Sequence, residues 1–242
     1  MTTELRLATA DGPMAAYLAV PASPGPHPAV VVVQEAFGVN AHIREVCDRF
    51  AAAGGVALAP EIFHRAGSGL DIPYTEMPAA MAQLALLTNA GLEQDLAAAL
   101  AHLRGRADVD PARVGVVGFC VGGFAAFLAA CRLDPAVTVS FYGGGIVRAR
   151  AGLALEPLLD EADGIHAPLL CLFGSEDGGI PPADVAAIRG RLEGLAGGHQ
   201  VVVYEGAKHA FFCDARPAYH PAAAQAAWAR TLAFLGLAGS PP

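Results

Sequence analysis

The sequence has 242 residues, of which 54% are hydrophobic and 16% are charged, and its formal net charge is −8. This composition supplies enough apolar side chains for one sizeable core and is unlike that of a disordered chain. The acidic balance leaves no basic surface to neutralise a phosphate backbone or an anionic lipid surface. We therefore expect neither nucleic acid nor a membrane as a partner.

The N-terminus carries no apolar run that would predict a signal peptide. The stretch Val114 to Cys131 has 18 residues without a charge, the lower length limit of a transmembrane helix, but its four glycines favour a buried strand–turn–helix unit. The five cysteines form no CxxC pair, which argues against a disulfide scaffold and against a structural zinc site. Together these features predict a cytoplasmic protein.

Short β-rich runs alternate with longer apolar-periodic segments along the whole chain, which predicts one α/β domain over residues 1–242. Its core is expected to be a mainly parallel sheet of about eight strands with helices on both faces. The predicted strands are, in chain order, 5–8, 15–20, 29–33, 56–59, 113–118, 136–142, 168–173 and 200–204. The first two are expected as an antiparallel pair at the sheet edge. Asn40 is the predicted cap of the first helix, a loop follows residue 60, and the last helix is expected from Pro221 to Leu235.

The segment Gly118-Phe119-Cys120-Val121-Gly122 follows a predicted strand and precedes an apolar helix. This is the context of the G-x-nucleophile-x-G turn, in which small neighbours let the central side chain project from the sheet. The N–H of Val121 would then face a developing oxyanion at the start of a helix. Taken alone, the pentapeptide fits a buried structural cysteine equally well.

Asp177 and His209 follow Cys120 in the order nucleophile, acid, base that α/β-hydrolases use. Each comes directly after a predicted strand, so all three are expected at the edge where parallel strands end. His220 is a poorer base because it stands at a predicted helix start rather than after a strand. The competing candidates for the acid are Glu176 and Asp184.

The segment from Gln34 to Asn40 follows the valine-rich third strand, where hydrolases of this kind supply the second oxyanion N–H. Ala36 is the expected donor. Glu35 is a carboxylate at the end of a buried strand, and burying it has a cost unless another group pairs with it. The alternative for Glu35 is a structural carboxylate hydrogen-bonded to backbone, and residue spacing alone favours this alternative.

Motifs along nearly the whole chain are Gln34 to Asn40, Pro60 to Arg65, Gly118 to Gly123, Ser140 to Gly143, Asp177 with Pro181, and Lys208 to Phe211. They resemble those of the dienelactone hydrolase family. The resemblance implies the α/β-hydrolase fold and carboxymethylenebutenolidase-type hydrolysis without a metal or an organic cofactor. It also implies that Glu35 hydrogen-bonds the resting Cys120 thiol and takes its proton when substrate binds.

Two departures from the family pattern concern arginines that bind a substrate carboxylate. In well-known members one arginine follows the catalytic histidine by four positions, where this chain has Cys213, and another follows the Pro60 loop, where no arginine stands between Arg65 and Arg104. We therefore expect neutral lactones or small esters to be better substrates than dienelactone, unless Arg65 supplies the cation. The side chains expected to contact substrate are Phe37, Tyr142, Phe211 and Arg65.

The predicted activity is hydrolysis of small-molecule esters or lactones through a thioester on Cys120, with His209 as base and Asp177 as its partner. A thiol is also a good leaving group, so activated esters suit it better than amides. The alternatives are a broad carboxylesterase or thioesterase for neutral acyl substrates, and a catalytically silent binding module. The sequence holds no GxGxxG and no HExxH motif. It leaves the oligomeric state open, and a monomer is compatible with it.

Overall fold

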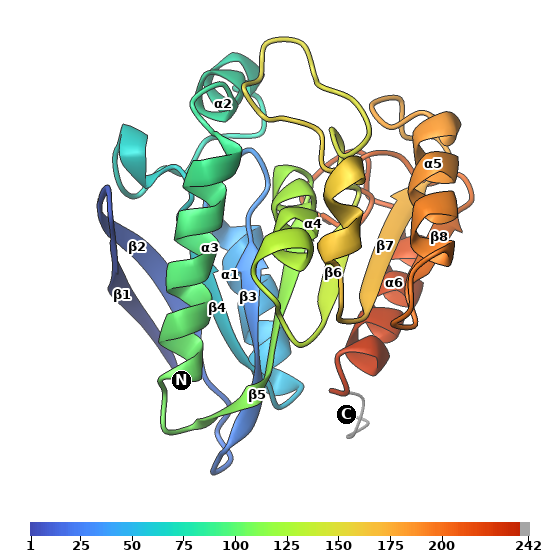
Figure 1. The fold of residues 1–242 in the computed structure, drawn as a ribbon. Helices are drawn as coiled ribbons and strands as arrows, with labels where there is room; N and C mark the ends of the chain where they lie inside the picture. The colour runs from blue at the N-terminus through green and yellow to red at the C-terminus, as the bar shows by residue number, and fades with distance from the viewer. Residues whose placement is uncertain (238–242) are drawn as a thin grey trace.

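The computed structural model describes residues 1–237, and its centre is an eight-stranded sheet with the order β1-β2-β4-β3-β5-β6-β7-β8 (Figure 1). The pairs β1–β2 and β2–β4 are antiparallel, whereas all pairings from β4 across to β8 are parallel. This confirms the predicted α/β class with an antiparallel pair at the edge. The strands are β1 (Thr2–Thr9), β2 (Gly12–Ala19), β3 (His27–Val33), β4 (Val56–Pro60), β5 (Val109–Phe119), β6 (Thr138–Phe141), β7 (Leu169–Gly174) and β8 (Gln200–Tyr204).

Helices cover both faces of the sheet (Figure 1). One face carries α1 and α6, which meet through the rings of Phe50 and Trp228, 4.6 Å apart, and the other carries α3, α4 and α5. None of the helices in residues 1–237 has the length and apolarity needed to cross a bilayer. The helices are α1 (Ala41–Ala52), α2 (Met77–Leu84), α3 (Asn89–Arg104), α4 (Val121–Arg132), α5 (Pro182–Glu193) and α6 (Pro221–Phe234), with short 3₁₀ turns η1 (His64–Ala66) and η2 (Leu159–Gly164).

The central strands are buried because β-branched side chains fill both faces of a parallel sheet. Residues 29–33 of β3 include four consecutive valines, and all five side chains are almost inaccessible. β5 begins at Val109, four residues earlier than predicted, because His27 pairs with Val109 ahead of a register shift. Residues 110–112 of this extension are not buried, so the hydrophobic pattern of the sequence does not reveal them.

Candidate active site

Cys120 stands between β5 and α4 at a sharp turn, with φ 58° and ψ −116°. This left-handed conformation costs a non-glycine residue about 1–3 kcal/mol, and surrounding packing must hold it. The packing here depends on two glycines. A side chain at Gly118 would collide with the carbonyl of Gly122, and one at Gly122 would collide with the backbone at the end of β3. The predicted turn is therefore present, and it raises the Cys120 side chain above the sheet.

His209 and Asp177 reach Cys120 from the loops that follow β8 and β7. His209 Nε2 lies 3.1 Å from Cys120 Sγ, and His209 Nδ1 lies 2.7 Å from Asp177 Oδ2. The second carboxylate oxygen of Asp177 accepts a hydrogen bond of 2.9 Å from the N–H of Gly179. The Asp177 side chain is fully buried, whereas that of His209 is 28% exposed. The acid is thus fixed from both sides, and the base remains open to a substrate.

The surroundings of His209 favour its protonated form. Burial disfavours the imidazolium, but the Cys120 sulfur and the hydrogen-bonded Asp177 outweigh burial and raise the pKa of His209 to about 10. A positively charged ring beside the sulfur stabilises a thiolate, which is the nucleophilic form of cysteine. His209 Nε2 is therefore placed to exchange a proton with the Cys120 sulfur.

Two backbone amides are available to bind an oxyanion near Cys120. Val121 is the first residue of α4, so its N–H is one of those without an intrahelical acceptor. Within residues 1–237, the N–H of Ala36 donates no hydrogen bond to backbone or side chain. It follows β3 directly, and β3 is the sheet neighbour of β5. These are the two donors expected from the sequence, and both keep their hydrogen-bonding capacity free.

Glu35 is buried to 1% exposure, but its contacts differ from those that the family resemblance implied. Tyr142 donates a hydrogen bond of 3.2 Å to Glu35 Oε1, and Arg216 Nη1 lies 3.7 Å from Glu35 Oε2. The Cys120 sulfur bonds to His209 instead. The expected hydrogen bond between Glu35 and the resting thiol is therefore wrong for this conformation, because Tyr142 and Arg216 hold the carboxylate.

Glu35 should make stability depend on pH. Burial raises the pKa of Glu35, and Arg216, His209 and Tyr142 compensate only in part. Because an unfolded glutamate ionises at lower pH than Glu35 does in the folded state, stability falls as pH rises from about 4.3 through the folded pKa. Glu35→Gln removes this loss, which amounts to about 1.4 kcal/mol for each unit of pKa difference.

Urea unfolding of Glu35→Gln and of the wild type between pH 4 and pH 8 tests this dependence. We expect similar unfolding free energies at pH 4 and an advantage for the variant that grows toward pH 8. Glu45→Gln, on the exposed side of α1, is the control and should follow the wild type. A constant difference between Glu35→Gln and the wild type at all pH values would contradict the linkage.

Arg216 is the main site residue that the sequence analysis missed. Its guanidinium lies over the rings of Phe37 and Tyr74, 5.2 and 5.6 Å from their centroids, while it faces Glu35. The two positions at which the family pattern expects a carboxylate-binding arginine lack one, but Arg216 brings a guanidinium to the site from a third position. A turn closed by the hydrogen bond from Arg216 N to Cys213 O, 3.1 Å long, brings the side chain back to the site.

Arg65, the alternative cation in the sequence analysis, is engaged elsewhere. Its guanidinium contacts both carboxylate oxygens of Asp95 at 2.7 and 3.0 Å and Asp11 at 2.7 Å. The Asp95 side chain is fully buried, so removing Arg65 toward a substrate would leave a buried charge poorly compensated. The expectation that Arg65 binds the substrate is therefore wrong for this conformation, in which Asp11 and Asp95 hold its guanidinium.

The aromatic residues expected to line the site are buried and pack against its polar residues. Phe37, Tyr142 and Phe211 have 1% exposure or less. The ring of Tyr142 packs against His209 at 5.1 Å and against Phe211 at 5.3 Å. Tyr142 also has a positive φ of 38°, which directs its hydroxyl to Glu35. These rings position the polar groups and do not form an open substrate surface in this conformation.

Of the competing acid and base candidates, His220 and Asp184 have other partners, and Glu176 is exposed. His220 caps α6, accepting the N–H of Ala223 at its Nδ1 atom, and Asp184 forms an ion pair with Arg148. Among residues 1–237, no three His, Cys, Asp or Glu side chains are arranged to hold a metal ion. A cleft of about 480 Å³ lies away from Cys120, between β2, α1 and the loop at Leu70, and no residue of the site lines it.

Comparisons with known proteins agree with this geometry. Residues 14–238 match the model of the dienelactone hydrolase family. A Synechocystis protein with the provisional name carboxymethylenebutenolidase is 39% identical over 94% of this chain and 93% of its own. A Bradyrhizobium protein with the provisional name 2-oxo-3-(5-oxofuran-2-ylidene)propanoate lactonase is 36% identical over 91% of this chain and 88% of its own.

The comparison with solved structures also finds dienelactone hydrolases. The crystal structure of a Klebsiella pneumoniae protein, provisionally a dienelactone hydrolase, superimposes with a TM-score of 0.85 and 32% identity and covers 98% of each chain. An Anabaena variabilis dienelactone hydrolase, at 18% identity and a TM-score of 0.70, shares the fold. The sequence match, the relatives and the sheet order together show that the chain belongs to the dienelactone hydrolase family, of the α/β-hydrolase fold.

Proposed function

We propose that this protein hydrolyses ester or lactone bonds of small molecules, with Cys120 as nucleophile, His209 as general base and acid, and Asp177 as the group that orients His209. The observation that carries the proposal is the continuous contact from sulfur to imidazole to carboxylate, at 3.1 and 2.7 Å. The strained turn that exposes the sulfur supports the same chemistry, as does the N–H of Ala36, which has no acceptor within residues 1–237.

In the first half of the reaction, the Cys120 thiolate attacks the carbonyl carbon and forms a carbon–sulfur bond. The carbonyl electron pair moves to oxygen, and the N–H groups of Val121 and Ala36 stabilise the resulting oxyanion. When the intermediate collapses, the carbon–oxygen bond to the leaving group breaks, and protonated His209 gives its proton to the departing oxygen. The product of this half is a thioester on Cys120.

In the second half, water takes the place of the leaving group. Neutral His209 accepts a proton from water, and the hydroxide formed attacks the thioester carbonyl. Collapse breaks the carbon–sulfur bond, releases the acid and returns the thiolate beside the imidazolium. Asp177 stays ionised throughout and keeps Nδ1 of the ring protonated, so that Nε2 points at the sulfur.

The thioester gives the most direct test of the proposal. An activated aryl ester is mixed with the enzyme, the reaction is quenched in acid within milliseconds, and the intact protein is weighed by mass spectrometry. We expect the added mass of one acyl group, located on the Cys120 peptide and missing from Cys120→Ala. Slow turnover without acylated protein would argue against covalent catalysis, and absence of turnover on esters and lactones would favour the silent binding module.

Arg216 affects whether the site can bind a negatively charged substrate. The names of the Synechocystis and Bradyrhizobium relatives describe lactones that carry a carboxylate. In this chain Arg216 offers a guanidinium beside Glu35, with 17% of its side chain exposed. Such a cation can bind a carboxylate through charge-assisted hydrogen bonds. We therefore include lactones with a carboxylate among the substrates, contrary to the preference for neutral substrates expected from the sequence.

Arg216→Ala should lower kcat/KM for a carboxylate-bearing lactone by tenfold or more, since hydrogen bonds to charged groups contribute about 1.5–3 kcal/mol. A neutral lactone of the same ring size should lose less. The matched control is Arg230→Ala, because Arg230 on α6 contacts Gln200 at the start of β8, the end opposite to the site. Equal losses on both lactones would assign Arg216 to the support of Glu35 alone.

A further inference from the structure

Arg150 lies in the loop that follows β6. Among the described residues, 1–237, its side chain forms no hydrogen bond and no ion pair, and it is exposed. The neighbouring Arg148 is paired with Asp184, and Arg216 faces Glu35. Arg150 therefore keeps all its N–H donors available to a ligand.

The side chain of Arg150 reaches from its own loop to the loop that carries Asp177. A methyl group placed on Gly144 would lie 3.1 Å from Arg150 Nη1. One placed on Gly179 would lie 3.8 Å from Arg150 Nη2 and 3.3 Å from Asp177 Oδ1. The guanidinium thus lies across two residues without side chains, one of them two positions from Asp177.

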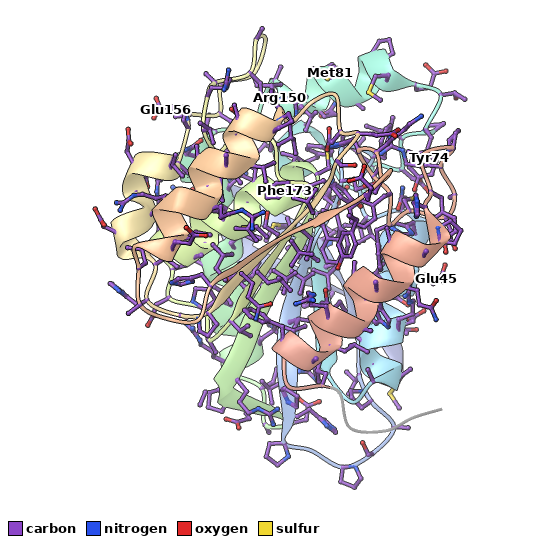
Figure 2. The ribbon with its side chains drawn as sticks, turned by 90° about the vertical axis from the view of Figure 1, so that its right-hand side faces the viewer. Glu45, Tyr74, Met81, Arg150, Glu156 and Phe173 are labelled. Atoms are coloured by element: carbon purple, nitrogen blue, oxygen red, sulfur yellow. The ribbon has the colours of Figure 1, made fainter. Side chains whose placement is uncertain are left out.

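The stem of Arg150 lies near the helix that begins at the nucleophile. A methyl group on Gly145 would lie 3.6 Å from both Arg150 Cδ and Phe124 Cδ2. The N–H of Phe124 bonds to the carbonyl of Cys120, one helical turn away. Figure 2 shows Arg150 and Tyr74 at the same upper end of the molecule, where the parallel strands end. Since Tyr74 lies under Arg216, the two arginines stand at this end on different loops.

We propose that Arg150 determines specificity for acyl substrates that carry a carboxylate at the end remote from the scissile carbonyl, by binding that carboxylate. This inference rests on the proposed function and adds an anchor on the β6–β7 side of the site. The remote carboxylate meets a guanidinium that needs no rearrangement of an existing ion pair, unlike Arg148 or Arg65. The missing side chains of Gly144 and Gly179 leave the guanidinium face uncovered.

The test compares two aryl esters of equal chain length, mono-4-nitrophenyl adipate and 4-nitrophenyl hexanoate. The ratio of their kcat/KM values is measured for the wild type, Arg150→Ala, Arg150→Lys and Arg148→Ala. Arg150→Ala should lower the ratio about tenfold or more, mainly through KM of the adipate. Arg150→Lys should restore part of it, and Arg148→Ala should keep the wild-type ratio. Added NaCl should lower the ratio of the wild type more than that of Arg150→Ala, which keeps only Arg216 as a cation for the carboxylate.

The outcomes separate this inference from the proposed function. Hydrolysis of the hexanoate that needs Cys120, together with an unchanged ratio in Arg150→Ala, overturns the role of Arg150 alone. An equal loss on both esters also overturns it, because it assigns Arg150 to the support of the Asp177 loop. Failure of the wild type to hydrolyse either ester overturns the proposed function itself.

Discussion

Replacing Cys120 with alanine should abolish hydrolysis of activated esters, with kcat/KM reduced by about 10⁴-fold or more. No other group in the site can form the acyl-enzyme, since His209 is oriented toward the sulfur and Asp177 is buried behind it. Cys120→Ser should retain only a trace, because an alcohol needs a stronger base than a thiol does. The measurement is initial rate on one aryl ester, with thermal unfolding as a check of the fold.

Cys131→Ala is the matched control for this change. Cys131 lies near the end of α4, the helix that Cys120 precedes, and is also partly exposed. Burial and Glu161 raise the pKa of Cys131 to about 12, and it has no histidine partner among residues 1–237. We expect Cys131→Ala to keep wild-type kcat/KM. Activity in Cys120→Ala above that of His209→Ala would show that another nucleophile carries the reaction.

The three triad candidates could be predicted because each is fixed by backbone position. Parallel strands end at one edge of a sheet, so a residue that directly follows a strand has its place determined by topology. Cys120 follows β5 directly, and Asp177 and His209 lie three and five residues beyond the ends of β7 and β8, at the same edge. The glycines around Cys120 add a steric requirement that sequence shows directly. Local sequence and global fold agree at these positions, and for that reason the residues could be named without the structure.

Residues placed by tertiary packing could not be predicted in the same way. Arg216 reaches Glu35 through a turn after His209, and its spacing differs from the family pattern by three positions. The pairing of Arg65 with Asp95 joins segments 30 residues apart, and no local pattern encodes it. Glu35 was correctly expected to be buried, but its partners come from Tyr142 and Arg216, far along the chain. The sequence predicted the fold, but it did not predict which partners these three side chains contact.

His209→Ala should be as damaging as the loss of Cys120, because nucleophile and base act as one unit. Asp177→Asn should cost about 10²–10⁴-fold in kcat/KM, since an amide can present its NH₂ group to Nδ1 and favour the wrong tautomer. His220→Ala is the matched control. His220 also follows β8, but it caps α6 and does not contact Cys120, so its loss should leave kcat/KM within about threefold of the wild type, at a cost in stability of about 1 kcal/mol.

The pH profile distinguishes an orienting role of Asp177 from a merely structural one. In the wild type, the Cys120 sulfur and Asp177 hold the pKa of His209 at about 10, so kcat/KM should fall only as pH rises through that value and the ring loses the proton that the leaving group needs. Asp177→Asn removes a negative charge that stabilises the imidazolium, so the falling limb should move to lower pH. A falling limb that stays near pH 10 in Asp177→Asn, or His220→Ala as the inactivating change, would refute the assignment of Asp177 and His209.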